Sequence, residues 1–217
     1  MARGGTPGKR PWLAADQAHA YAAPIGGGTG WRACATSPLT VCRLRAGSPG
    51  ERYGGILIRK ASFPPVAAAD ARVLILGSLP GERSLAAQRY YAHPQNQFWQ
   101  LLAPLIGVDL PTLDYDARLA AVQSAGIALW DVVATATRSG STDAAIRDPA
   151  ANDLAALVDR LPQLRAVAFN GGTALRLGRP LLAGRRLELL ALPSSSPLHT
   201  IGRAAKQTAW NVIGDYL

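Results

Sequence analysis

Cysteine is nearly absent from this sequence of 217 residues, which contains only Cys34 and Cys42. Two thiols are too few for a disulfide scaffold, a four-thiolate iron–sulfur cluster or a zinc site closed by cysteines. No apolar run reaches the roughly 18 residues of a membrane span, and the first 30 residues lack the apolar centre of a signal peptide. We therefore expect a soluble, cytoplasmic protein without a membrane, metal, iron–sulfur cluster or other cofactor.

Lysine and the acidic residues are also scarce. Of the 23 cationic residues only three are lysine, and the 14 Asp and Glu leave a formal net charge of +9. A hydrophobic content of 48% with 17% charged residues excludes a wholly disordered chain. The basic balance is compatible with a nucleic-acid partner, although charge by itself identifies none.

Most of the charge lies near the amino terminus. Residues 1–60 carry a net charge of +7 and residues 61–217 only +2. The early segment is rich in Gly, Pro and Ala, and no strand or helix period persists there before Ile56. We interpret residues 1–54 as a flexible basic extension and residues 55–217 as the folded domain. The extension either adds non-specific phosphate affinity or has no role.

Four short apolar runs typical of buried parallel strands follow in the second part of the chain. Helical spacing of apolar residues separates them, and the runs span residues 73–76, 127–130, 166–169 and 187–192. Strands that alternate with helices imply right-handed crossovers. The sequence thus predicts an α/β fold, a three-layer α/β/α sandwich with a central, mainly parallel four-stranded sheet. Ligands of such sheets bind at the carboxyl ends of the strands.

The residues that follow the predicted strands are small, polar or aromatic. Gly-Ser-Leu-Pro-Gly follows the first strand at 77–81, and Pro-Ser-Ser-Ser-Pro-Leu-His follows the fourth at 193–199. The first loop has neither the Gly-Lys-Ser/Thr ending of a phosphate-binding loop nor the spacing of a dinucleotide turn, and it forms no G-x-S-x-G elbow. Nucleotide-binding and serine-hydrolase chemistry are therefore poorly supported.

The ordered combination of motifs resembles the uracil-DNA glycosylase superfamily. The motifs are the loop at 77–81, Tyr-Tyr-Ala-His-Pro-Gln-Asn-Gln-Phe-Trp at 90–99, and the Pro-Ser-Ser-Ser segment at 193–196. The chain is most similar to the hypoxanthine-DNA (deoxyinosine) glycosylase branch, and more distantly to mismatch-specific uracil- and thymine-DNA glycosylases. The resemblance covers roughly residues 60–217. It implies an enzyme that flips a damaged base into a pocket and lets water attack the sugar C1′.

The resemblance assigns roles to several aromatic and polar residues. Tyr91 would stack on the base and Asn96 would position the water, whereas the structural alternatives are a core tyrosine and a helix N-cap. Leu79 occupies the position at which mismatch-specific relatives carry a water-holding Asn, so Glu82 is the second candidate for that role. Phe98 is grouped with the substrate-binding residues, although it also suits packing of the helix on the sheet.

Asp131 stands where several relatives use an Asn to read uracil. An ionised carboxylate only accepts hydrogen bonds, so it would pair with the N3–H of uracil or the N1–H of hypoxanthine. The alternatives are that it faces the sugar cation or caps the next turn. The other substrate-binding candidates come from the strand ends and are Gly77, Ser78, Leu79 and Asn170.

In the family, the segment that matches 193–199 enters the minor groove, where serines touch phosphates and a side chain fills the space left by the flipped nucleotide. Leu198 is the candidate wedge. His199 is the candidate contact to a phosphate or to negative charge developing on the base. The remaining DNA-binding candidates are Ser194, Ser195, Ser196 and Arg138.

The scarcity of lysine also bears on the reaction. A glycosylase with lyase activity needs an amine for a Schiff base, and the domain offers only Lys60 and Lys206, both outside the motif loops. We therefore predict a monofunctional glycosylase that excises a deaminated base and leaves an abasic site, with uracil ranked slightly ahead of hypoxanthine. We expect a monomer, associated with the nucleoid if the protein is bacterial. The alternatives are a catalytically weak lesion-binding module on the same fold, and a nucleotide-handling enzyme unrelated to DNA.

Overall fold

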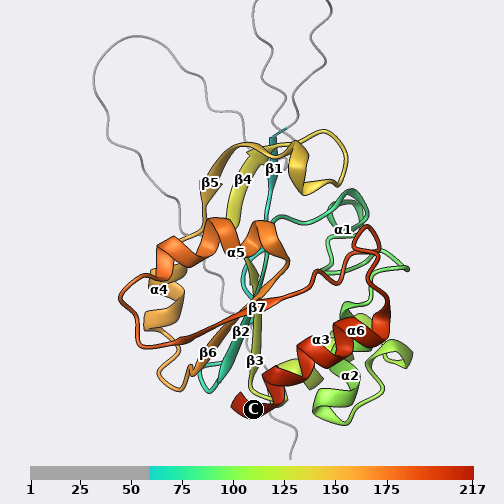
Figure 1. Cartoon of the computed structure of the whole chain (residues 1–217), viewed down its shortest axis with the longest axis vertical. Coiled ribbons are helices and arrows are strands. Elements are labelled where there is room, and N and C mark those ends of the chain that lie inside the picture. Colours follow the sequence, from blue (N-terminus) through green and yellow to red (C-terminus); the bar gives the residue numbers. More distant parts are fainter. Residues whose placement is uncertain (1–58) are drawn as a thin grey trace, which may run out of the picture. The chain divides into compact units, whose positions relative to one another are not determined.

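The computed structural model describes residues 59–217. The predicted extension, residues 1–54, and both cysteines lie outside this part of the chain. The described residues form a parallel sheet of four strands and an antiparallel sheet of three strands, with helices on both faces of the parallel sheet (Figure 1).

The parallel sheet consists of the four strands that the sequence predicts, each within about a residue of the predicted bounds. Its strands lie in the order β3-β2-β6-β7 and every neighbouring pair is parallel. The bounds are β2 (Val73–Gly77), β3 (Ile127–Asp131), β6 (Ala166–Asn170) and β7 (Glu188–Leu192). Because β2 pairs with β3 on one side and with β6 on the other, the chain reverses its winding there, which opens a crevice at the carboxyl ends of the strands.

Both faces of the sheet are covered, which confirms the three-layer α/β/α prediction. Val73 and Ile75 of β2 pack on one side with residues of the helices α2 (Phe98–Ile106), α3 (Tyr115–Ser124) and α6 (Arg203–Trp210). Leu74 and Leu76 pack on the other side with residues of α4 (Leu154–Asp159) and α5 (Gly172–Gly178). Figure 1 shows these two groups of helices on opposite sides of the strands.

Local signals in the sequence set where these helices begin and end. The Asp114 side chain accepts a hydrogen bond from the Ala117 amide at the start of α3, and Asp153 accepts one from Ala156 at the start of α4. Such N-caps stabilise a helix by about 1 kcal/mol. Helix α2 ends at Gly107, whose φ of 66° is in the left-handed region that glycine adopts without strain.

The sequence patterns do not predict three of the strands and one short helix. The antiparallel sheet contains β1 (Arg59–Ala61), β4 (Val133–Thr137) and β5 (Arg147–Ala151) in the order β1-β4-β5. Every residue of β5 is exposed, so this strand has no apolar pattern to detect. Helix α1 (Glu82–Ala87) buries only Ser84. The 3₁₀ turns are η1 (Leu110–Thr112), η2 (Asp143–Ala145), η3 (Arg179–Leu182) and η4 (Asn211–Tyr216).

The end of the chain is helical in two parts: α6 ends at Trp210 and η4 continues to Tyr216. No helix within residues 59–217 combines the length and the apolar composition that crossing a bilayer requires.

Candidate active site

A cavity of about 660 Å³ opens at the carboxyl ends of the parallel strands. The predicted ligand position and the cavity therefore coincide. The structure brings most of the predicted site residues to its wall: Gly77, Ser78, Leu79, Tyr91, Asn96, Asp131, Asn170, Ser194, Ser195, Ser196, Leu198 and His199. The predicted residues that do not line it are Glu82, Phe98 and Arg138.

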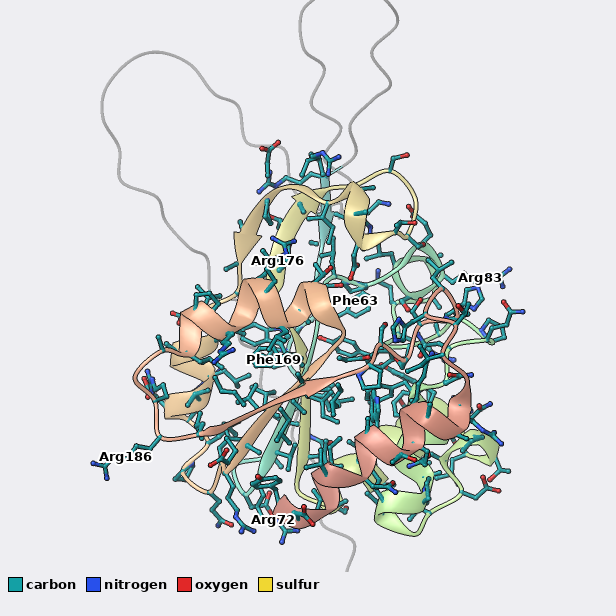
Figure 2. All side chains as sticks on the ribbon, viewed as in Figure 1. Phe63, Arg72, Arg83, Phe169, Arg176 and Arg186 are labelled. Atoms are coloured by element: carbon teal, nitrogen blue, oxygen red, sulfur yellow. The ribbon has the colours of Figure 1, made fainter. Side chains whose placement is uncertain are left out.

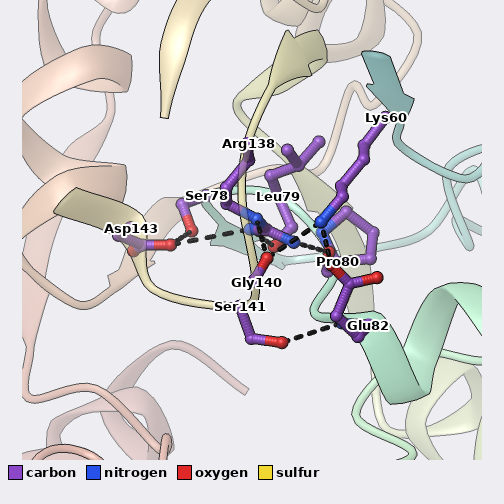
Figure 3. A network of polar contacts seen from close by, with 9 residues as sticks. All are labelled: Lys60, Ser78, Leu79, Pro80, Glu82, Arg138, Gly140, Ser141 and Asp143. Carbon is purple, nitrogen blue, oxygen red and sulfur yellow. Dashed lines mark hydrogen bonds and ion pairs between the residues drawn. The ribbon is translucent and has the colours of Figure 1, made fainter. Parts of the chain in front are cut away.

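Arg138 holds the loop at 77–81 by hydrogen bonds (Figure 3). Its guanidinium donates hydrogen bonds to the carbonyl oxygens of Leu79 (3.1 Å), Pro80 and Gly140 (3.0 Å). The Arg138 side chain has no exposed area, and burial lowers its pKa. The prediction of a phosphate contact is therefore wrong for Arg138, because carbonyl oxygens of the protein occupy its donors.

Two more hydrogen bonds hold the loop, one at Ser78 and one at Glu82, just after the loop. Ser78 Oγ donates to Asp143 Oδ1 at 2.7 Å, and Ser141 Oγ accepts from the Glu82 amide at 2.9 Å. The Leu79 side chain packs with Val133 and Ala136 in a small apolar cluster. Packing thus explains an apolar residue in a loop where the resemblance suggested a polar one.

Glu82, the second candidate for positioning the water, is paired with another protein group. Its side chain is half exposed on α1 and forms an ion pair with the Lys60 ammonium, which also donates to the Gly140 carbonyl at 2.9 Å. Glu82 does not line the cavity, although its neighbours Gly81 and Arg83 do, and its role in positioning water stays a prediction. The ion pair joins β1 to the start of α1.

Tyr91 and Phe98 form a stack at the cavity wall. Their ring centroids lie 3.5 Å apart with an interplanar angle of 7°. Phe98 is fully buried, so the prediction that it contacts substrate is wrong: it lies behind Tyr91. The Tyr91 backbone has φ 52°, a left-handed conformation that costs a non-glycine residue free energy and is often found at functional sites. Only the Tyr91 face opposite Phe98 is available to a stacking ligand.

Asn96 lines the cavity and also bonds to the start of α2. Its Oδ1 accepts a hydrogen bond at 3.0 Å from the amide of Phe98, the first residue of the helix. The N-cap position itself belongs to Gln97, so the alternative of Asn96 as the N-cap is wrong. The half-buried side chain also lines the cavity. A carbonyl oxygen has two lone pairs, so this bond fixes the orientation of the carboxamide and leaves one lone pair for a water molecule.

Asp131 lies on the cavity wall at the end of β3, with 4% of its surface exposed. Its Oδ2 accepts a hydrogen bond from Ser62 Oγ at 2.8 Å. A Cβ atom on Gly77, the partner of Asp131 in the sheet, would lie 2.4 Å from Oδ1, so only glycine fits there. Burial raises the pKa of Asp131 to about 7, assisted by the charge of Asp143 and opposed by the Ser62 hydrogen bond and by Arg138.

Asn170, at the end of β6, holds the loop that follows β7. Its Nδ2 donates to Ser195 Oγ at 2.9 Å and its Oδ1 accepts from the Ser195 amide at 2.8 Å. Ser195 has 1% of its surface exposed. The predicted phosphate contact is therefore wrong for Ser195, whose polar groups anchor the loop to the sheet.

Three further hydrogen bonds fix the loop at 193–199. Trp210 Nε1 donates to the Pro193 carbonyl at 2.9 Å, and Lys206 Nζ donates to the Ser196 carbonyl at 3.0 Å. The Leu198 amide donates to Ser196 Oγ at 3.2 Å. Lys206 is outside the motif loops in sequence but touches one in space, and burial lowers its pKa. Leu198 is 68% exposed and lines the cavity, and its role as a wedge stays a prediction.

Several residues that line the cavity were not among the predicted site residues. Asp143 accepts the Ser78 hydrogen bond from the turn η2, and His93 and Arg83 lie on other parts of the wall. Figure 2 shows Arg83 projecting outward on the side of α1, whereas Arg72 and Arg186 project elsewhere. The one sequence signal for Asp143 is the run of small hydroxyl residues before it. Among residues 59–217, no group of three or more His, Cys, Asp or Glu side chains is arranged to bind a metal ion.

Comparison with known proteins places the chain in a family. Residues 64–214 match the model of the uracil DNA glycosylase superfamily. The chain is 38% identical over 153 residues to a hypoxanthine DNA glycosylase of Methanosarcina barkeri, an alignment that covers 70% of this chain and 96% of the relative. It is 37% identical over 154 residues to a hypoxanthine DNA glycosylase of Methanosarcina acetivorans, with 71% and 97% covered.

A solved structure agrees with these matches. It is the solution NMR structure of a Methanosarcina acetivorans protein assigned provisionally as a uracil DNA glycosylase, with a TM-score of 0.66 and 36% identity. The similarity covers 72% of this chain and 96% of that one. The fold is thus shared with a known relative. The chain belongs to the uracil DNA glycosylase superfamily and is a DNA glycosylase, a hydrolase of N-glycosyl bonds.

Proposed function

We propose that the protein removes a deaminated base, with hypoxanthine as its first substrate and uracil as its second. The observation that carries this proposal is the cavity at the strand ends, which presents an aromatic face (Tyr91), a buried carboxyl group (Asp131) and a carboxamide held by the Phe98 amide (Asn96). Ligand pockets of several hundred Å³ accept small organic molecules, so a purine nucleoside fits in size. Relatives named for hypoxanthine favour this base over uracil, in contrast to the ranking from the sequence.

The reaction follows from the three side chains. A base within a duplex is inaccessible, so the nucleotide turns outward and the base stacks on the free face of Tyr91. The bond between C1′ and the base nitrogen breaks with its electron pair moving to the base, and the sugar acquires oxocarbenium character. The oxygen of a water held by Asn96 Oδ1 then bonds to C1′, and one water proton ends on the departing base. The products are the free base and an abasic site.

The experiment compares duplexes that carry one hypoxanthine, uracil, thymine mismatch or xanthine. The full chain, in molar excess over the DNA, is incubated with each duplex, and alkali then cleaves the abasic sites. We expect cleavage with hypoxanthine first and uracil second. Lesion-selective binding without cleavage of any substrate would instead favour the catalytically weak binding module.

The monofunctional character is tested on the same duplexes. We expect no covalent protein–DNA adduct after borohydride reduction, because neither Lys60 nor Lys206, the lysines of the described residues, lines the cavity. An adduct that disappears in Lys206→Arg would show that the amine beside Ser196 reaches the sugar.

A further inference from the structure

The two carboxyl oxygens of Asp131 have different surroundings. Its Oδ2 is occupied by the Ser62 hydroxyl at 2.8 Å, a shorter contact than the 3.3 Å between the same hydroxyl and the Phe63 carbonyl. Among residues 59–217, no side chain or backbone amide donates a hydrogen bond to Oδ1. This oxygen lies over Gly77, where the absence of a Cβ atom leaves it room.

Within the described part of the chain, no cation is paired with Asp131. The titratable groups around it are the phenols of Tyr90 and Tyr91, the carboxylate of Asp143 and the guanidinium of Arg138. Arg138 directs its donors to carbonyl oxygens, and the carboxylate it approaches to 4.0 Å is Asp143. A buried carboxyl group with a neighbouring carboxylate and without a paired cation retains its proton to unusually high pH, in agreement with a pKa of about 7.

The proton changes what Asp131 recognises. An ionised carboxylate only accepts hydrogen bonds, whereas a carboxylic acid donates from one oxygen and accepts on the other. Because the Ser62 hydroxyl donates to Oδ2, Oδ2 is the acceptor and the proton belongs on Oδ1. The side chain then presents a donor and an acceptor in a fixed order.

We propose that Asp131 acts as a carboxylic acid that reads the lactam edge of the flipped base, with Oδ1–H donating to the base carbonyl oxygen and Oδ2 accepting from the adjacent ring N–H. Hypoxanthine has this edge at O6 and N1–H, and uracil has it at O4 and N3–H. Adenine and cytosine have the opposite order, an amino group beside a ring acceptor, so that donor would meet donor and acceptor would meet acceptor. The Ser62–Asp131 pair thereby selects deaminated bases over their undamaged precursors. This inference rests on the proposed function.

The first test is the pH dependence of single-turnover excision of hypoxanthine by the full chain. The wild-type rate constant should be constant below about pH 7 and fall about tenfold per pH unit above it. Asp131→Asn, which keeps a donor and an acceptor but cannot ionise, should excise hypoxanthine at a rate that does not change with pH from 6 to 9. Asp159→Asn changes an exposed carboxylate of α4 away from the cavity and should keep the wild-type profile.

Two outcomes would overturn the inference. One is a wild-type rate that rises through pH 7, as expected for an ionised group. The other is an Asp131→Asn enzyme that retains the fall above pH 7. Asp143→Asn supplies an internal check, since removal of a charge that raises the pKa of Asp131 should move the fall to lower pH.

The second test examines the base edge directly. Duplexes with 1-methylhypoxanthine, which lacks the N1–H, or with unsubstituted purine, which lacks both O6 and the N1–H, should be excised at least about tenfold more slowly, the effect of removing at least one hydrogen bond to a buried polar group. In Ser62→Ala, where either oxygen can carry the proton, the ratio of hypoxanthine to adenine excision should fall. Equal rates for hypoxanthine and its 1-methyl derivative would contradict the proposal that Asp131 binds the lactam edge of the base.

Failure of the proposed function can be separated from failure of this inference. If no duplex is cleaved at any pH, the glycosylase substrates proposed above are wrong. The protonation of Asp131 is then measured in the free protein by a ¹³C NMR titration of its carboxyl carbon, assigned with Asp131→Asn. A midpoint near pH 7 supports the acid form, and a midpoint near pH 4 overturns it.

Discussion

Asp131 couples the chemistry of the cavity to the stability of the protein. A carboxyl group whose pKa is higher in the folded than in the unfolded state binds more protons when folded, so stability decreases as pH rises between the two values. For Asp131 that window extends from about 4 to about 7. Burial of Asp131 therefore lowers the free energy of unfolding at high pH, where the group is ionised.

Asp131→Asn should therefore be more stable than the wild type at pH 8.5 and equally stable near pH 4. The expected gain at high pH is about 2–4 kcal/mol, from the free energy of about 1.4 kcal/mol per unit of pKa shift. Urea denaturation at both pH values measures it. A difference that is the same at pH 4 and pH 8.5 would show that the gain does not come from ionisation.

Asn96 has a structural and a chemical function that substitution can separate. Asn96→Ala should lose about 1 kcal/mol of stability, the usual net value of one hydrogen bond, and about 10²- to 10³-fold in excision rate if its oxygen holds the water. Asn96→Ser retains an oxygen that can accept from the Phe98 amide and should recover the stability but not the rate. Thermal unfolding and single-turnover excision measure the two effects. Full activity in Asn96→Ser would remove Asn96 from the reaction.

The loop at 77–81 depends on a partner segment for its shape. Arg138 and Asp143 bind the loop, Ser141 binds the Glu82 amide that follows it, and the Gly140 carbonyl accepts from Arg138, all from one continuous stretch of chain (Figure 3). This stretch connects β4 to β5, so the antiparallel sheet positions the loop that forms one wall of the cavity.

Arg138→Met should destabilise the protein by about 2–4 kcal/mol, because the carbonyl oxygens of Leu79 and Pro80 lose a charged donor while they remain buried. The rate of excision should also fall, because the loop at 77–81 that lines the cavity loses the hydrogen bonds from Arg138. Arg176→Met, at an exposed arginine of α5, serves as the matched control and should leave both quantities unchanged. Denaturant titration with excision assays distinguishes this support from a DNA contact, which would change affinity and its salt dependence without changing stability.

The loop at 193–199 has the opposite character, since it is held rigidly at its base and exposed at its tip. Ser195 is anchored to β6 and the Ser196 carbonyl to α6, while Leu198 projects. Leu198→Ala should reduce excision from duplex DNA about tenfold or more by removing the side chain that fills the vacated stack. Excision from single-stranded DNA should change less, and Tm should not change. Leu181→Ala, at another exposed leucine, should leave all three quantities unchanged.

Charge is distributed unevenly along the whole chain. Seven Lys and Arg lie within residues 1–54, and the net charge of residues 61–217 is only +2. Affinity that arises from neutralised phosphates decreases with salt in proportion to their number. The segment that carries most of the charge and the domain that carries the cavity are thus different parts of the sequence.

Removal of residues 1–54 should weaken non-specific DNA binding and reduce its salt dependence, by about 0.9 in the slope of log K against log salt for each phosphate that is no longer neutralised. Excision of hypoxanthine at saturating protein should stay nearly unchanged. Binding isotherms at several salt concentrations measure the first effect. Loss of excision would mean that the extension belongs to the active enzyme and that the predicted domain boundary is wrong.

Much of the fold follows from local patterns in the sequence. The apolar runs that predict β2, β3 and β6 are continuous because these parallel strands are buried on both faces. The edge strand β7 has an apolar run as well, although Leu192 is its one buried residue. Strand β5 and helix α1 have no such pattern because they are almost entirely exposed. The cavity was predictable at the strand ends because the topology of an α/β sheet determines it.

The sequence by itself determined the sheet, its helices and the loops that meet at the cavity, since burial and motif order are properties of neighbouring residues. Only the tertiary structure decided what individual side chains do there. Arg138, Phe98, Ser195 and Glu82 all lie within or beside motif loops, yet their partners are protein atoms. Asp131 acquires its raised pKa from burial and from Asp143, which is twelve residues away in sequence. Electrostatic environment and hydrogen-bond competition depend on groups that the chain brings together from distant positions, and no local pattern encodes them.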